Sequence, residues 1–340
     1  MTVRPWPRTA PATRVPAART RSASALLGAS FALLAASACA SSPRLALTPA
    51  ELRAELRQRI GDLGPADEIV PFEVGPDAVA LAREKLVAVR EPAERARALA
   101  DLLRSSEGFG LRYEWATTDT AEGTLLRGGG NCMSLSSVLI GLARDLGLTA
   151  YYLEVLIADP TRRDDAGVAV YADHVAAMIA TREGGIFVDY SGELPHARAV
   201  RAIGDLEAVA YYFTNRGYEL MHRADRASAP VPWQLVAREF ELATRVQPGM
   251  ARAWNNLGVA RARLGDDPQA RIAYERAIEL QPELRSAHVN YAMLLERSGD
   301  RAGAARHLEL ARSLAADHGI REVEREPSPA SRPDQDGSSG

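Results

Sequence analysis

Apolar residues with helical spacing predict several helices early in the chain. Helices are expected over 51–60, 77–90 and 92–106. The first begins with Thr48 as its capping residue and Pro49 at its first helical position. The stretch 62–76 is rich in Gly, Pro and Asp, so we expect a loop there.

The middle of the chain changes from helical to strand patterns. An apolar helix is expected over 133–146, after an irregular stretch at 107–130, and Gly147 closes it. Strands are expected over 149–157, 174–181 and 186–190. The last two form a hairpin across 182–185, and 159–167 is expected to be a polar loop. Helices followed by strands predict an α+β domain rather than a doubly wound α/β domain.

From Leu206 onward the pattern is helical and it repeats. Residues at the spacings of the 34-residue tetratricopeptide pattern are Trp254, Leu257, Gly258, Ala270, Tyr274, Ala277 and Pro282. A second copy follows, and a degenerate copy with an insertion around 224–232 precedes them. We therefore predict an all-α repeat array over 206–321 and a disordered, Pro- and Ser-rich tail over 322–340.

The first 38 residues predict a secretory signal. A basic stretch leads into an apolar run at 25–36, which is too short for a stable transmembrane helix. The sequence Ala36-Ser37-Ala38-Cys39 resembles the lipobox of bacterial lipoproteins, which implies lipid attachment at Cys39. Ala40 in place of Asp implies an outer-membrane lipoprotein facing the periplasm, with 39–47 as a tether. The alternative is ordinary signal cleavage, which gives a soluble periplasmic protein.

The net charge and the cysteine content limit which partners the chain is expected to bind and which chemistry it is expected to perform. The formal net charge is −3, and residues 1–38 hold five arginines and no acid, so the rest is more acidic still. An acidic body argues against nucleic acid as a partner, because phosphate binding needs a basic face. The chain has two cysteines, Cys39 and Cys132. If Cys39 is acylated, Cys132 is a lone thiol in an oxidising compartment, which is a reason to expect chemistry there.

Cys132 stands where the apolar helix begins, directly after Gly128-Gly129-Gly130-Asn131. Helix N–H groups favour a thiolate at that place, and glycines let a substrate backbone approach. The backbone N–H of Cys132 can also help to hold an oxyanion. His174 opens a strand and Asp189 closes its hairpin partner, so the two can lie side by side. The acid would then orient the imidazole, and the imidazole would take the thiol proton.

These segments resemble the transglutaminase-like superfamily. Gly130-Asn131-Cys132-Met133-Ser134 is similar to its cysteine segment, Asp173-His174-Val175 to its histidine strand and Phe187-Val188-Asp189-Tyr190 to its aspartate strand. The resemblance implies a papain-like α+β domain, which we place at 48–205, and thiol acyl chemistry on amides. For the family's additional oxyanion donor, Trp115 and Tyr113 are the candidates. The chain is also similar to bacterial proteins that fuse such a domain to tetratricopeptides.

Two functions remain open. In the first, Cys132 is the nucleophile, His174 the general base and then acid, and Asp189 the orienting group of an envelope hydrolase or acyltransferase. In the second, the domain is an inactive relic and the repeats serve as a scaffold for envelope assembly or secretion. In both, the array binds a peptide or protein. No metal, nucleotide or other cofactor is expected, since no pair of histidines has metal-ligand spacing.

Overall fold

The computed structural model describes residues 45–61, 69–157, 162–165, 168–171, 174–182, 184–191 and 197–317. Its N-terminal helices are α1 (Pro49–Ile60), α2 (Pro76–Lys85) and α3 (Pro92–Arg104). The predicted start of α1 is confirmed, because Thr48 and Glu51 form a reciprocal capping box. The second helix is shorter than predicted, since the chain has to turn before Pro92 begins α3.

The stretch 107–130, expected to be irregular, contains three short elements. They are β1 (Arg112–Tyr113), α4 (Ala121–Arg127) and β2 (Gly129–Gly130). Thr120 caps α4 by accepting the N–H of Gly123, and Gly128 ends it with a φ of 80°. The expectation was wrong for α4, because one seven-residue helix containing a glycine shows no apolar periodicity.

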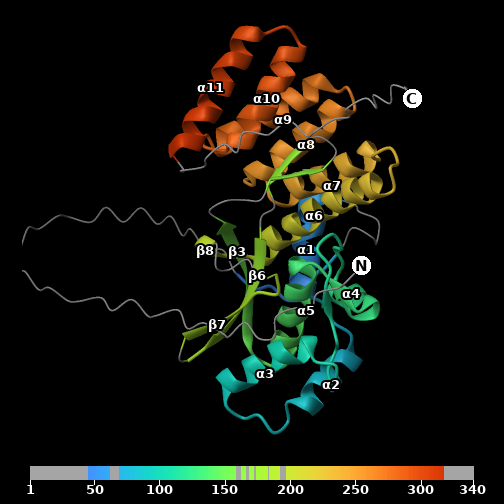
Figure 1. Ribbon diagram of the computed structural model, residues 1–340. Coiled ribbons are helices and arrows are strands. Elements are labelled where there is room, and N and C mark those ends of the chain that lie inside the picture. The colour runs from blue at the N-terminus through green and yellow to red at the C-terminus, as the bar shows by residue number, and fades with distance from the viewer. Residues whose placement is uncertain are drawn as a thin grey trace, which may run out of the picture.

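Helix α5 (Cys132–Asp145) is the central element of the first domain. Every residue from Cys132 to Ala143 is buried, as the apolar pattern predicted. The helix packs against an antiparallel sheet of four strands (Figure 1). Their order is β7 (Gly184–Val188), β6 (His174–Thr181), β3 (Thr149–Ile157) and β8 (Ala197–Ile203). A Cβ on Gly141 would stand 2.0 Å from the carbonyl oxygen of Phe72, so only glycine allows this close approach.

The strands are β3 (Thr149–Ile157), β4 (Arg162–Asp165), β5 (Val168–Tyr171), β6 (His174–Thr181), β7 (Gly184–Val188) and β8 (Ala197–Ile203). Strand β7 begins two residues earlier than predicted, and Thr181 pairs with Gly184. The hairpin turn is therefore two residues long rather than four. A small hairpin, β4-β5, replaces the polar loop expected at 159–167. Strand β8 was not predicted, because its Ala- and Arg-rich sequence lacks apolar alternation.

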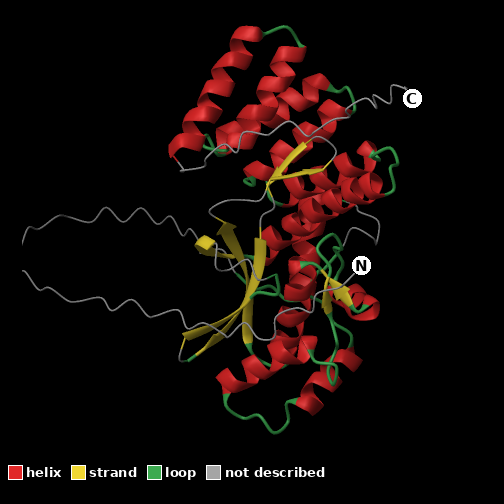
Figure 2. Cartoon of the chain, in the orientation of Figure 1, coloured by secondary structure: helices red, strands yellow, loops and turns green. Residues whose placement is uncertain are grey.

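The C-terminal half is the predicted array of antiparallel helices (Figure 2). Its members are α6 (Asp205–Arg226), α7 (Trp233–Val246), α8 (Ala251–Arg263), α9 (Asp267–Leu280), α10 (Arg285–Arg297) and α11 (Arg301–Asp317). A Cβ on Gly258 would lie 2.6 Å from the ring of Tyr274, which explains the glycine of the repeat pattern. None of the described helices is both long and apolar enough to cross a membrane.

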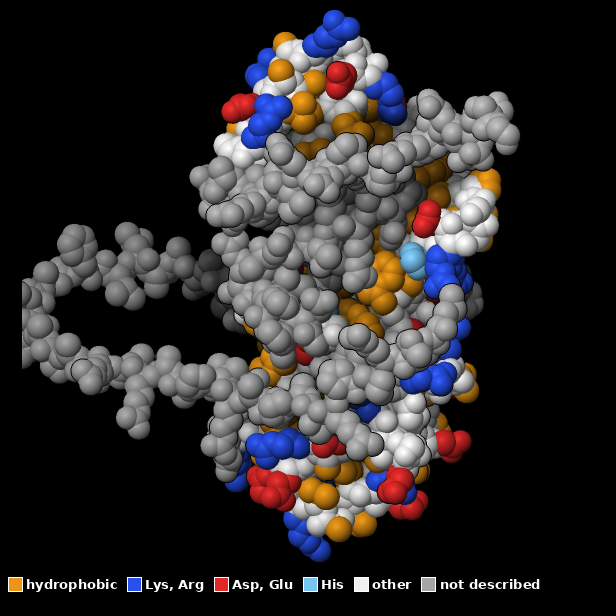
Figure 3. All heavy atoms as spheres, viewed as in Figure 1, with side chains coloured by type: hydrophobic (Ala, Val, Ile, Leu, Met, Phe, Trp, Pro, Cys, Tyr) orange, Lys and Arg blue, Asp and Glu red, His pale blue; other side chains and the backbone are white. Residues whose placement is uncertain are grey.

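Two large hydrophobic cores divide the molecule, and α6 belongs to both. Its first half, with Tyr212 and Phe213, lies in the core of α5 and the sheet. Its second half, with Met221, lies in the core of the remaining repeats. The predicted division near residue 205 stays a prediction, and it falls at the start of this shared helix. On the face drawn in Figure 3, charged side chains of both signs are interspersed at the two ends.

A buried carboxylate joins three distant segments of the first domain. Asp205, 1% exposed, accepts two hydrogen bonds from the guanidinium of Arg144, at 2.8 and 2.9 Å, and one from the N–H of Leu47 at 2.7 Å. Arg144 also donates to the carbonyl oxygen of Ala150 and lies over the ring of Phe72. Burial raises the pKa of Asp205, while Arg144 and the Leu47 N–H oppose that shift.

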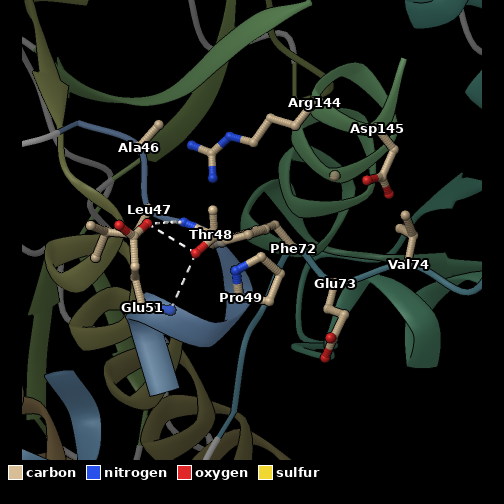
Figure 4. A pocket seen from close by; sticks show the side chains of 11 residues that line it. Ala46, Leu47, Thr48, Pro49, Glu51, Phe72, Glu73, Val74, Arg144 and Asp145 are labelled. Atoms are coloured by element: carbon tan, nitrogen blue, oxygen red, sulfur yellow. Dashed lines mark hydrogen bonds between the residues drawn. The ribbon is translucent and has the colours of Figure 1, made fainter. Parts of the chain in front are cut away.

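A cavity of about 720 Å³ is lined by Leu47 and Arg144, the two hydrogen-bond partners of this carboxylate (Figure 4). Its lining includes Leu47 and Thr48 on one side and Arg144 and Asp145 on the other. These last residues end α5, whereas Cys132 begins it. At 1.5 Å per residue the two ends of the helix are roughly 20 Å apart. The cavity is therefore separate from the predicted active site.

The Arg144–Asp205 pair predicts a large loss of stability when one partner is removed. Asp205→Asn would leave the guanidinium without its counterion, and breaking such a buried pair costs about 3–5 kcal/mol. Urea unfolding measures this loss. The matched control is Glu309→Gln in the exposed Arg312–Glu309 pair, which is expected to change the unfolding free energy by less than about 1 kcal/mol. Equal effects of the two substitutions would contradict the assignment.

Candidate functional site

The predicted nucleophile is the first residue of α5. Asn131 caps the helix, and its side-chain oxygen accepts the N–H of Ser134 at 3.1 Å. Its side-chain nitrogen donates to Thr118 Oγ1 at 2.8 Å. Cys132 itself is 9% exposed. The cap fixes the first turn and holds the thiol at the positive end of the helix dipole.

The glycines before the cysteine serve the packing of this turn. Gly128 takes the left-handed conformation that ends α4. A Cβ on Gly129 would lie 2.7 Å from the carbonyl oxygen of Arg112, and one on Gly130 would lie 2.6 Å from the side chain of Ser134. We expected these glycines to make room for a substrate. The contacts give them a structural reason, since β1 and β2 pair directly beside the helix start.

His174 and Asp189 meet on neighbouring strands, as their positions in the hairpin predicted. His174 begins β6 and is 4% exposed. Its Nε2 lies 2.6 Å from Asp189 Oδ1, directly after the end of β7. This contact occupies Nε2, and His174 also acts on Cys132, because its charge lowers the pKa of the thiol. The structure thus brings the three predicted residues together.

Ser191 is a site residue that the sequence analysis missed. Its hydroxyl lies 3.0 Å from His174 Nε2 and 2.9 Å from Asp189 Oδ1. Its backbone N–H also donates to Asp189 Oδ1 at 2.9 Å. An aspartate that accepts the N–H two residues later forms an Asx turn, so the spacing Asp189-Tyr190-Ser191 was the available signal. Ser191 holds the carboxylate against the imidazole.

The electrostatics of the three groups favour a charged pair. Burial would raise the pKa of the Cys132 thiol, but the charge and hydrogen bond of His174 and the N–H of Val175 bring it below its usual value. Burial would lower the pKa of His174, but Cys132 and Asp189 raise it. Burial would raise the pKa of Asp189, but His174 and Ser191 lower it. The arrangement therefore favours thiolate, imidazolium and carboxylate together.

The two proposed oxyanion donors lie on the segment that runs beside the helix start. Tyr113 is in β1 and pairs with Gly130. The Trp115 ring meets His222 of α6 edge-on, with centroids 4.9 Å apart. For both residues the donor role stays a prediction. Cys39 lies outside the described residues, and within those residues no group of three or more His, Cys, Asp and Glu side chains could hold a metal ion.

Two protein-family models match parts of the chain. The one described as the transglutaminase-like superfamily matches residues 79–190, a range that holds Cys132, His174 and Asp189. The one described as a tetratricopeptide repeat matches residues 251–284, which comprise α8 and α9. Both domain types that the sequence predicted are thereby confirmed.

Two solved structures that resemble the chain each match about a third of it. The TPR2B-domain:pHsp70-complex of yeast Sti1 is 24% identical, with a TM-score of 0.29, and the match covers 32% of this chain and 81% of that one. The crystal structure of MamA is 18% identical, with a TM-score of 0.29, over 34% of this chain and 70% of that one. No curated protein is similar enough to register as a match.

The pairing of thiol and imidazole predicts how Cys132 reacts with iodoacetamide. Because its pKa is lowered, the thiolate persists as pH falls below about 8.5, where an ordinary thiol becomes protonated. Alkylation should then stay fast in acid and decline only as pH falls through the lowered pKa. Mass spectrometry of the Cys132 peptide, from pH 4 to 10, measures the rate in the full chain in mild detergent.

His174→Ala removes the charge and hydrogen bond that lower the thiol pKa, so its reaction profile should move to higher pH. His307→Ala, in α11, is the matched control and should leave the profile unchanged. The charged pair would be contradicted if the thiol of the unaltered protein reacted only above about pH 8. It would also be contradicted if His174→Ala left the reaction profile unchanged.

Proposed function

On the premise that the chain joins a transglutaminase-like domain at 79–190 to a tetratricopeptide repeat at 251–284, we propose that it is a cysteine acyl-transfer enzyme acting on amides of peptides or proteins. The observation that carries the proposal is the buried contact of His174 with Asp189, together with the lowering of the Cys132 thiol pKa by the same His174. A protein-interaction role follows from the repeat type. Hydrolysis or transfer of an acyl group by Cys132 is what we propose in addition to that role.

The proposed reaction begins with attack of the thiolate on the amide carbonyl carbon. A C–S bond forms, and the carbonyl electrons become an oxyanion that the N–H of Cys132 would help to stabilise. His174 gives its proton to the amide nitrogen, the C–N bond breaks and an amine leaves. A thioester on Cys132 remains. Asp189 and Ser191 hold the imidazole in the orientation that this proton transfer requires.

The second half of the reaction releases the acyl group. Water or a second amine attacks the thioester carbon, and His174 takes the proton of the attacking group. The C–S bond breaks and the thiolate returns. Water gives hydrolysis, and an amine gives a new amide. The same residues support both outcomes, so the attacking group decides between protease and transglutaminase activity.

The repeats support recruitment of a peptide or protein. Arrays of this kind bind extended partners along the surface that stacked repeats create. Because α6 belongs to both cores, a bound protein would be held close to the domain that carries Cys132. The second candidate function is a non-catalytic scaffold, which the burial of Cys132 and His174 favours, since a substrate has to reach a thiol that is 9% exposed.

Acyl transfer predicts a covalent product that depends on Cys132. The full chain is incubated with a tryptic digest of envelope proteins and a biotinylated primary amine, which traps the thioester. Biotin-labelled peptides or new hydrolysis products are expected from the unaltered protein and none from Cys132→Ala. Asp189→Asn should lower the rate at least roughly 100-fold. His307→Ala is the control. Product that persists in Cys132→Ala, or no product at all, would favour the scaffold.

We further propose that Cys39 carries a lipid that holds the protein at the outer membrane. The lipobox-like sequence before Cys39 supports this. After cell fractionation, the unaltered chain should float with outer-membrane vesicles in a density gradient, whereas Cys39→Ser should appear with the soluble periplasmic proteins. The same distribution for both proteins would refute lipidation and leave ordinary signal cleavage.

A further inference from the structure

Helix α6 of the repeat array carries a buried carboxylate that contacts the first domain. Glu219 is 9% exposed, and its Oε2 accepts the backbone N–H of Thr118 at 3.0 Å. Thr118 Oγ1 in turn accepts the side-chain N–H of Asn131 at 2.8 Å. Asn131 is the cap of α5 and directly precedes Cys132. A continuous buried path of hydrogen bonds therefore runs from the array to the helix start.

Other contacts clamp the same loop between α6 and α5. The N–H of Asn131 donates to the carbonyl oxygen of Thr117 at 2.8 Å, and the N–H of Asp119 donates to Ser134 Oγ at 2.9 Å. On the side of α6, the ring of Trp115 packs on His222, one turn after Glu219. The loop 115–119 is thus held by α5 on one side and by α6 on the other.

The burial of the Glu219 carboxylate needs a structural explanation. A carboxylate is seldom buried unless hydrogen bonds or an ion pair compensate for the lost water. Glu219 forms an ion pair with Arg223 on its own helix, and Arg216 and Arg127 also act on it. The hydrogen bond from Thr118 joins Glu219 to the loop, alongside the packing of Trp115 on His222. Packing of the repeats alone does not require it.

We propose that Glu219 is a positioning residue for the Cys132 thiolate and that α6 is thereby part of the active centre. The inference rests on the proposed function of Cys132. Glu219 fixes the backbone at Thr118, Thr118 fixes the side chain of Asn131, and Asn131 fixes the first turn of α5. That turn presents its N–H groups and the positive end of its dipole to the thiolate. A loosened loop weakens this support and the alignment of the thiol with His174.

The test separates the hydrogen bond from the charge. Glu219→Ala removes both, whereas Glu219→Gln keeps an oxygen that can accept the Thr118 N–H. Glu241→Ala is the matched control, because Glu241 also pairs with an arginine, Arg261, but does so within the array. The second-order rate of Cys132 alkylation is measured in the full chain from pH 5 to 9. Thermal unfolding is followed in parallel, so that a general loss of fold is recognised.

Glu219→Ala is expected to raise the apparent thiol pKa by about one unit, the size of effect typical of a helix terminus, and so to slow alkylation by up to about tenfold at pH values below the thiol pKa. Glu219→Gln and Glu241→Ala should keep the profile of the unaltered protein. A Glu219→Ala profile that does not move overturns the inference. Equal shifts in Glu219→Ala and Glu219→Gln also overturn it, because they assign the effect to charge.

A second pair of variants covers the case in which Glu219→Ala does not fold. Thr118→Val removes the hydroxyl that accepts from Asn131, and Thr118→Ser retains it. The first should raise the thiol pKa and the second should not, and equal profiles overturn the inference. An unactivated thiol in the unaltered protein overturns the proposed function and this inference together. If the thiol is activated but its profile does not change in Glu219→Ala, this inference is overturned and the proposed function is not.

Discussion

The side chain of Asn131 accepts the N–H of Ser134 and donates to Thr118, and this pair of hydrogen bonds determines where α5 begins. The thiol of Cys132 lies at the positive end of the helix dipole because the helix starts at that residue. The tight glycine turn, the β1-β2 pairing and the loop held by α6 all converge on this one cap. A shift of the cap by a single residue would rotate the thiol by about 100° around the helix axis, away from His174.

A buried ion pair is stable only when every charged partner is also hydrogen-bonded. The site meets that condition through the sheet. Strand β6 pairs with β7 in a register that places Ala177 opposite Val188. Extended by three residues, the same register sets position 191 opposite His174, which is why Ser191 reaches both the imidazole and Asp189. The thiolate of the pair comes from α5, whereas the imidazole and its hydrogen-bonding partners come from the sheet.

The sequence was sufficient to predict those elements and residues that a local pattern indicates. Leucine spacing predicted α5, and the Cys, His and Asp segments predicted which side chains would meet. Ser191 and Glu219 were missed for other reasons. The hairpin turn was expected to be four residues long, and the observed two-residue turn changes which residues face each other across the strands. Glu219 contacts a residue 101 positions away, and no local pattern encodes such a pairing.

The hydrogen bond from Leu47 to Asp205 also fixes the point at which the folded body of the protein begins. With lipid on Cys39, as proposed, eight peptide links separate the membrane anchor from the folded body, and a fully extended chain of that length spans at most about 28 Å. The folded body would then stay close to the bilayer. A substrate held at the membrane surface would accordingly be encountered more often than one that diffuses freely.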